Sequence, residues 1–365
     1  KLGWWHDVCP GQRLTLRDAT AKSVLSLAGG SHEAAMRVLV EVLQQRDLAH
    51  TVTAVGHRVV HGGEAFSAST RLDDTVLAAI AACSRLAPLH NPANLMGIEV
   101  AEKLFPGVPN VGVFDTEFGM GMPKEAFMYA LPYEMYEELR IRRYGFHGTS
   151  HKYIANATAQ FLGKPLSELR SITMHLGNGS SMSCVKNGKC FDTSMGLTPL
   201  EGLVMGTRCG TIDPAIVPFI MEKKGLSPAE ADTLMNKKSG LLGLCGYTDM
   251  RDVHAQVEKG NDRAELALKL LVRSIKKTLG SYFFLLEGNV DALVFTAGIG
   301  EHNAVLRQRV CNQLEWLGVQ VDATRNARHE AVISSTASTV TVGVERTNEE
   351  WIAAWHAARL LGPAT

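Results

Sequence analysis

Apolar runs of strand length alternate with longer segments of helical periodicity along this chain, and this alternation limits the possible folds more than any other feature. Strands are predicted in TVTAV (51–55), VGVFD (111–115), SITMHL (171–176), SMSCVKNGKCFD (181–192), VDALVFTAGIGE (290–301, ending in a glycine turn) and 339–344. Helices are predicted over 32–45 (capped by Ser31), 74–83, 94–104, 151–163, 214–224, 228–237, 262–287, 303–317 and 349–361, after an irregular start. The alternation predicts an α/β protein with mixed sheets.

The totals describe an ordinary globular protein without a dominant charge. The 365 residues suffice for two domains, and 45% of them are hydrophobic. The 37 basic residues equal the 37 acidic ones, so net charge gives no reason to expect a nucleic-acid or membrane partner. No run approaches the roughly 18 apolar residues that span a bilayer. The seven cysteines lack metal-ligand spacing, which indicates reduced thiols and a cytoplasmic protein.

The segment HLGNGSS interrupts two strand-like runs with two glycines, an asparagine and two hydroxyls, from Gly177 to Ser181. A hairpin turn explains it most simply, because Asn-Gly is a strong turn signal. A phosphate-binding loop is the alternative, since bare glycine backbone approaches an anion closely. Asn187-Gly188 is a second such dipeptide, and a two-residue hairpin turn suffices to explain it.

Charged and glycine-rich groups gather where four segments end, as ligand-binding groups do in α/β proteins. They are GHRVVHGGE with Arg58, VFDT with Asp115, RRYGFHGTSH (142–151) and EGLVMGTRCGTIDP with Arg208. Taken singly, each has an ordinary structural explanation: a carboxylate caps a helix, a histidine is satisfied in the core, and an arginine beside glycine lies in a surface loop.

Together these groups fit the transfer of a phosphoryl group to an anionic acceptor. The transferred group carries charge on three equatorial oxygens, so catalysis is mostly positioning and positive charge, with a metal held by carboxylates. Arginine suits both phosphate and carboxylate, because its planar fork donates two parallel hydrogen bonds.

The order of these phrases resembles the acetate kinase family. The matching phrases are GHRVVHGGE, LAPLHNP, RRYGFHGTSH, HLGNGSS, SMGLTPLEGLVMGTRCGTIDPAIVP, LMNKKSGLLG, FTAGIGE and TNEE, which cover nearly the whole chain from residue 51 onward. The resemblance implies a two-domain, actin-like (ribonuclease H-like) fold with a cleft between the domains. It implies an N-terminal domain of residues 1–116 plus 351–365, a nucleotide-binding domain of residues 117–350, and a homodimer.

The resemblance also implies reversible transfer of the γ-phosphoryl group of ATP to acetate, giving acetyl phosphate and ADP, with Mg²⁺ or possibly Mn²⁺ bound. Arg58 and Arg208 resemble the pair that binds acetate and the transferring group, and His147 the residue that stabilises transition-state charge. Asp115 resembles the catalytic carboxylate, and Glu349 the one that positions Mg²⁺.

The nucleotide site follows from the same resemblance. Its phosphate loop is expected to comprise His175, Gly177, Asn178, Gly179 and Ser180. The adenosine is expected beside Gly298, Ile299 and Gly300, with Asp249 and Arg251 nearby. On this basis the GNGSS segment is both a turn and a phosphate loop.

A small apolar pocket for the acetate methyl group is implied as well. Its residues are Val60, Leu89, Phe146 and Pro199. Valine leaves less room than a smaller residue would, so the sequence favours acetate over propionate. One methylene is worth only about 1–3 kcal/mol of discrimination, so propionate is expected to be a poor substrate but still a substrate.

The chain departs from the family pattern in three places. The family begins with a strand and an Asn-x-Gly-Ser-Ser-Ser-x-Lys loop that has no match here, so the sequence is expected to be incomplete before Lys1. Glu117 and Gly119 replace an alanine and a histidine close to Asp115. Glu345-Arg346 replace Ile-Pro before TNEE. These departures leave two alternatives: a nucleotide-binding protein of the same fold with impaired catalysis, or a propionate or butyrate kinase.

Overall fold

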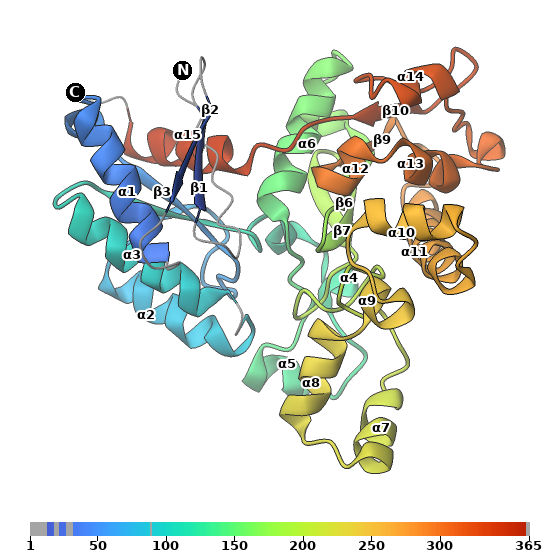
Figure 1. Ribbon diagram of the computed structural model, residues 1–365, viewed down its shortest axis with the longest axis horizontal. Coiled ribbons are helices and arrows are strands. Elements are labelled where there is room, and N and C mark those ends of the chain that lie inside the picture. Colours follow the sequence, from blue (N-terminus) through green and yellow to red (C-terminus); the bar gives the residue numbers. More distant parts are fainter. Residues whose placement is uncertain (1–12, 18–21, 27–31, 88–89, 363–365) are drawn as a thin grey trace. The chain divides into compact units, whose positions relative to one another are not determined.

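The computed structural model contains two compact units (Figure 1). The structure describes residues 13–17, 22–26, 32–87 and 90–362. Unit 1 is drawn from Lys1–Val59, Ala68–Val113 and Ala353–Thr365, and unit 2 from Val60–Ser67 and Phe114–Ile352.

Unit 1 contains a small sheet with the strand order β3-β5-β4. Its described strands and helices are β1 (Arg13–Arg17), β2 (Lys22–Ser26), α1 (His32–Gln45), β3 (Val55–Val59), β4 (Thr70–Arg71), α2 (Asp74–Ala82), α3 (Asn91–Leu104), β5 (Asn110–Phe114) and most of α15 (Glu349–Leu361). Val111 and Val113 of β5 are fully buried and pack against Ala353 and Ala357 of α15. Helix α15, which follows unit 2 in the sequence, therefore completes this part of the core of unit 1.

Unit 2 is built on a five-stranded sheet with the order β10-β9-β6-β7-β8. The strands are β6 (Arg170–Leu176), β7 (Ser180–Lys186), β8 (Lys189–Thr193), β9 (Ala292–Thr296) and β10 (Thr341–Val344). β6 pairs with β7 antiparallel and with β9 parallel, and β9 pairs with β10 parallel. The predicted α/β class with mixed sheets is confirmed.

Helices cover both faces of this sheet (Figure 1). One face packs on α6 (Gly148–Phe161), through Ile154 against Ala292 and Val294. The other face packs on α11 (Asp262–Leu285), in a large cluster that includes Met174 and Phe295. Because side chains alternate along a strand, Thr173 and His175 of β6 lie on the α6 face, opposite to Met174.

Shorter helices surround these layers. In unit 2 they are α4 (Lys124–Phe127), α5 (Tyr133–Leu139), α7 (Ile216–Lys224), α8 (Pro228–Lys237), α9 (Gly240–Cys245), α10 (Met250–Glu258), α12 (Ala297–His302), α13 (Ala304–Cys311) and α14 (Ala323–Ala327). No helix among the described residues is both long and apolar enough to cross a membrane.

Four secondary-structure predictions were wrong. The helix expected over 303–317 ends at Cys311 as α13, and a separate 3₁₀ helix covers Glu315–Leu317. The strand expected at 51–55 lies at Val55–Val59, and a short 3₁₀ helix covers Ala49–Thr51. The glycine turn expected after β9 is the helix α12. The start of the chain, expected to be irregular, contains the antiparallel pair β1 and β2. For the strand at Val55–Val59, tertiary pairing with β5 decided the position, rather than local β propensity.

Candidate active site

The GNGSS segment is the turn between β6 and β7, as predicted. Leu176 pairs with Ser180, and the Gly177 N–H donates to the Gly179 carbonyl at 3.2 Å. The Ser180 hydroxyl donates to the Gly177 carbonyl at 2.9 Å. The exposed Asn178 accepts a hydrogen bond at its carbonyl from the Gly206 N–H at 3.1 Å. A side chain at Gly206 would collide with the Asn178 amide, so this turn and the segment before Arg208 pack closely.

Arg208 lies directly beside this turn. A Cβ atom built on Gly179 would lie 3.3 Å from Arg208 Nη1, which donates to the Pro199 carbonyl at 3.0 Å. Burial lowers the pKa of the Arg208 guanidinium. Gly240, at the start of α9 with φ +60°, packs against the carbonyls of Met205 and Arg208, where a larger residue would collide. The loop that carries Arg208 is therefore held from two sides.

His147 joins the same cluster from the N-terminus of α6. Its φ of 56° is left-handed, an unusual conformation for a residue other than glycine. Its ring stacks on that of His175, with the ring centres 4.1 Å apart and 16° between the planes. A Cβ atom on Gly179 would lie 3.6 Å from His147 Nε2, so this nitrogen faces the turn and Arg208. His147 Nδ1 lies 2.8 Å from Ser181 Oγ.

Asp115 follows β5 and is only 1% exposed. Its Oδ1 accepts a hydrogen bond from the Thr149 hydroxyl at 3.2 Å, and its backbone carbonyl accepts one from Gly148 N–H at 2.9 Å. Both donors belong to the first turn of α6, next to His147. Asp115 is thus fixed against the helix that also presents His147.

The predicted adenosine segment follows β9 and adjoins the turn through the sheet register. His175 pairs with Thr296, and a Cβ atom on Gly177 would lie 3.9 Å from that of Ala297. Gly298, Ile299 and Gly300 form the first turns of α12. The fully buried Arg307 donates to the Gly300 carbonyl at 2.7 Å and holds this helix.

The remaining predicted residues lie nearby or in the other unit. Asp249 caps α10 and forms an ion pair with Arg251, and His254 of the same helix is 3.1 Å from Asn303 after α12. Val60 and Phe146 are buried in unit 2. Glu349 begins α15, and its half-buried side chain belongs to unit 2. Arg58 is exposed on β3 of unit 1, and Leu89 lies outside the described residues.

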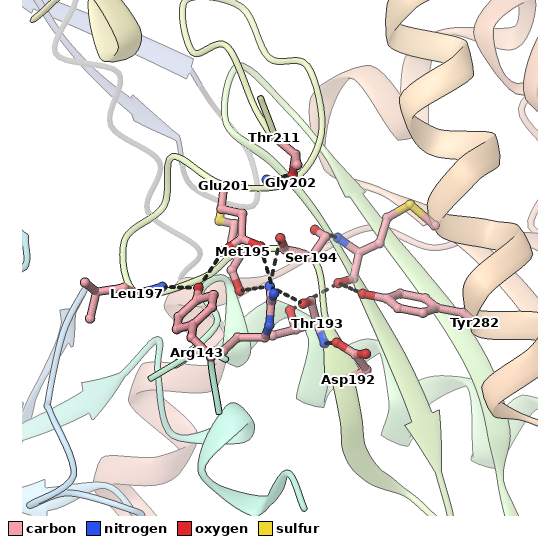
Figure 2. A network of polar contacts seen from close by, with 12 residues as sticks. Arg143, Asp192, Thr193, Ser194, Met195, Leu197, Glu201, Gly202, Thr211 and Tyr282 are labelled. Atoms are coloured by element: carbon pink, nitrogen blue, oxygen red, sulfur yellow. Dashed lines mark hydrogen bonds and ion pairs between the residues drawn. The ribbon is translucent and has the colours of Figure 1, made fainter. Parts of the chain in front are cut away.

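A partly buried network supports the segment from Thr193 to Glu201 (Figure 2). Arg143 Nη1 donates to the carbonyls of Thr193, Ser194 and Met195, and its Nη2 lies 2.7 Å from Glu201 Oε1. The Tyr129 hydroxyl donates to Glu201 Oε2 at 2.5 Å and accepts from the Leu197 N–H at 3.1 Å. The segment so held includes Pro199, whose carbonyl binds Arg208.

The two departures beside Asp115 have structural explanations. Lys152 Nζ lies 2.7 Å from Glu117 Oε1, and the Glu117 side chain is only 9% exposed. A Cβ atom on Gly119 would collide with the Tyr144 carbonyl. Glu117 is therefore a paired charge, and close packing requires glycine at position 119. Nothing in the structure explains Arg346, which is exposed.

Replacing Gly119 by alanine is expected to lower the free energy of unfolding by about 1–3 kcal/mol, because the added methyl group must displace backbone. Gly121 is the matched control, since it belongs to the same 3₁₀ helix and an added Cβ there meets nothing within 4 Å. Urea unfolding of Gly119→Ala and Gly121→Ala measures both effects. Equal stability of the two variants would show that position 119 tolerates a side chain.

Several polar residues of the site were not identified from the sequence. Thr173 stood only within a predicted strand, and the others stood within quoted motifs without an assigned role: Arg143, Ser150, His151, Glu201 and Thr347. The Thr347 hydroxyl donates to Ser150 Oγ at 2.9 Å, and His175 Nδ1 lies 2.8 Å from the same oxygen. Sheet register and helix packing bring these residues together, so local sequence gives no indication of them.

Comparisons with known proteins identify the family of this chain. A family model described as the Acetokinase family matches residues 7–355. The chain is 67% identical to a protein of Desulfovibrio desulfuricans named acetate kinase, over 98% of this chain and 89% of that protein. Among solved structures, a propionate kinase from Francisella tularensis has a TM-score of 0.91 at 42% identity, covering 95% of this chain and 89% of that one. An acetate kinase from Porphyromonas gingivalis has a TM-score of 0.89 at 43% identity, covering 97% and 91%.

Proposed function

The chain belongs to the acetokinase family, and from this premise we propose that it catalyses reversible, Mg²⁺-dependent transfer of the γ-phosphoryl group of ATP to acetate, giving acetyl phosphate and ADP. The observation that carries the proposal is the cluster of the Arg208 guanidinium, His147 Nε2 and the Gly177–Gly179 turn within unit 2. The Arg208 cation and the His147 ring nitrogen both lie beside the glycine backbone at Gly179. Such a region suits a transferring phosphoryl group.

In the proposed reaction a carboxylate oxygen of acetate attacks the γ-phosphorus in line with the departing ADP oxygen. Arg208 is proposed to bind the equatorial phosphoryl oxygens, and Arg58 the acetate carboxylate. His147 donates a hydrogen bond to the developing charge. The backbone of Gly177 to Ser180 binds the other phosphates, and Gly298 to Gly300 adjoin the adenosine. Unit 2 is accordingly proposed as the nucleotide-binding part.

The carboxylates of Asp115 and Glu349 fit Mg²⁺, which prefers hard oxygen ligands. Among the described residues no three His, Cys, Asp or Glu side chains gather as a metal site. This agrees with Mg²⁺, which is bound by one or two carboxylates and completes its shell with water and substrate phosphates. When bound, the ion supplies positive charge to the phosphate oxygens. Mn²⁺ uses the same ligand types.

Two further properties are proposed from the family. A homodimer is expected, to be tested by light scattering of the purified protein. A cytoplasmic location is supported by the described cysteines, all of which are free thiols: Cys83, Cys184, Cys190, Cys209, Cys245 and Cys311.

The function is tested by incubating the purified chain with ATP, Mg²⁺ and acetate and trapping acetyl phosphate with hydroxylamine. Acetate-dependent hydroxamate formation is expected, and a reaction without acetate is the control. No product, with ATP binding retained in calorimetry, would refute the proposed kinase and leave a nucleotide-binding protein with impaired catalysis.

Propionate is the second candidate acceptor, because one similar solved structure is titled a propionate kinase. Val60 is only 8% exposed and is the residue expected to limit acceptor length. We expect kcat/KM for acetate to exceed that for propionate by about 10- to 200-fold, and Val60→Ala to narrow this ratio. Steady-state kinetics with both acids measure it. A wild-type preference for propionate would overturn the assignment of acetate.

A further inference from the structure

A chain of four polar side chains runs from the buried face of the sheet to His147. Thr173 Oγ1 lies 2.5 Å from His151 Nδ1, and His151 Nε2 lies 2.7 Å from Ser181 Oγ. Ser181 Oγ in turn lies 2.8 Å from His147 Nδ1. Thr173 and Ser181 are fully buried and His151 is 1% exposed, so water does not compete for the two bonds of His151.

Two proton arrangements satisfy the three links when the proton of the buried Ser181 hydroxyl is itself used in one of them, because each hydroxyl has one proton and each neutral imidazole has one. In the first, Thr173 donates to His151 Nδ1, His151 Nε2–H donates to Ser181, and Ser181 donates to His147 Nδ1. In the second, every donor and acceptor is reversed. The first leaves the proton of neutral His147 on Nε2, and the second places it on Nδ1.

The end of the chain at Thr173 distinguishes the two arrangements. Within the described part of the structure, the Thr173 hydroxyl forms its hydrogen bond with His151 Nδ1. In the reversed arrangement this hydroxyl accepts from His151, and its own proton is left in the core without an acceptor. A buried donor without a partner destabilises the folded protein, so the first arrangement is favoured.

His151 meets the requirement that its ring be neutral. Burial lowers its pKa to about 3, so it carries a single ring proton at neutral pH. Two neighbouring hydroxyls do not belong to this series of hydrogen bonds: Ser150 bonds to His175, and Thr149 bonds to Asp115. The direction of the chain is therefore set at Thr173.

We propose that Thr173, His151 and Ser181 are positioning residues that hold neutral His147 with its proton on Nε2. This nitrogen faces Gly179 and Arg208, where the proposed reaction develops negative charge. His147 can then donate a hydrogen bond to that charge without first becoming an imidazolium. The consequence for catalysis rests on the proposed function, but the position of the proton does not.

Long-range ¹H–¹⁵N NMR of ¹⁵N-histidine-labelled protein tests the position directly, because protonated and unprotonated ring nitrogens resonate far apart. The His147 signals are assigned by their loss in His147→Gln. The wild-type protein without substrates is expected to show Nε2 protonated and Nδ1 unprotonated. A protonated Nδ1 in neutral His147 would overturn the proposal, whether or not the protein makes acetyl phosphate.

Thr173→Val and Ser181→Ala test the chain by removing one hydroxyl each. Both are expected to alter the His147 ring signals, and Thr173→Val does so from a residue with no hydrogen bond to His147. In the acetyl phosphate assay, kcat is expected to fall about 10- to 100-fold, as when partners that orient functional histidines are lost, with nucleotide affinity unchanged. Ser181→Thr, which restores a hydroxyl, is expected to recover activity.

Ser183→Ala is the matched control, because Ser183 lies on the same strand and face as Ser181, is 1% exposed, and bonds to Cys190 and Asp192 instead. His147 signals and kcat like those of the wild type are expected. If Ser183→Ala and Ser181→Ala change the His147 signals equally, general loosening of β7 explains both and the proposal is wrong. A wild-type protein without kinase activity would refute the proposed function. The NMR measurement would still show which ring nitrogen of His147 carries the proton.

Discussion

Replacing Arg208 by alanine is expected to lower kcat for acetyl phosphate formation about 10²- to 10³-fold, the typical cost of losing one preorganised donor to transition-state charge. Arg208 lies beside the Gly179 turn and His147, and its guanidinium is already fixed on the Pro199 carbonyl before substrate binds. Because the proposed adenosine segment lies on α12, ADP affinity measured by calorimetry is expected to change little.

Two further variants separate charge from geometry. Arg208→Lys keeps the charge but loses the planar fork, so its kcat is expected to lie between those of the wild type and the alanine variant. Arg273→Ala, an exposed position on α11, is the control for removal of an arginine. Loss of ADP binding in Arg208→Ala, to the same extent as loss of kcat, would contradict the assigned role.

The free energy of unfolding is expected to fall steeply as the pH drops below 6.5, because two buried histidines remain neutral in the folded protein. Burial lowers the pKa of His151 to about 3 and that of His61 to about 4. Between these values and 6.5 the unfolded chain binds protons that the folded chain does not. Each histidine therefore reduces the free energy of unfolding by about 1.4 kcal/mol per pH unit in its window, and stability is fully regained above pH 6.5.

Urea unfolding at intervals from pH 7.5 to 5 measures this slope. Asp192 and Glu345, whose pKa values burial raises, contribute with the opposite sign, so the difference between variants is the sharper test. His151→Gln is expected to reduce the slope by about one proton. An unchanged slope in His151→Gln would show that this ring is protonated in the folded protein. His61→Gln provides the same comparison at a second site.

Local sequence predicted the elements whose structure depends on local contacts. The hairpin of β7 and β8 follows from Asn187-Gly188, which have φ values of 55° and 71°, as a tight turn requires. The strand VGHRV (55–59) was missed because glycine, histidine and arginine are poor strand signals, and pairing with β5 makes it a strand. Helix α12 was expected as a turn because its glycines disfavour a helix, but the buried Arg307 binds the carbonyls of Gly300 and Glu301.

The site residues likewise fall into those that the sequence identified and those that only tertiary contacts bring together. The resemblance identified His147, Arg208 and the Gly177–Gly179 turn, which the structure brings together. Ser181 reaches His151 because the β6–β7 register and the packing of α6 place them side by side, and no local motif marks such a contact. The reason for Gly119 was likewise hidden, since it depends on the backbone of Tyr144.

Unit 1 is built from segments that lie far apart in the sequence, and this has a consequence for biosynthesis. Val111 and Val113 are buried against Ala353 and Ala357, which the ribosome makes only after all of unit 2. The β6–β8 hairpins and the rest of unit 2 can form while the chain is still being translated. Unit 1 must wait, with the apolar side of β5 uncovered, until α15 emerges from the ribosome. The nascent chain is therefore most exposed to chaperones and aggregation at the domain that is synthesised first.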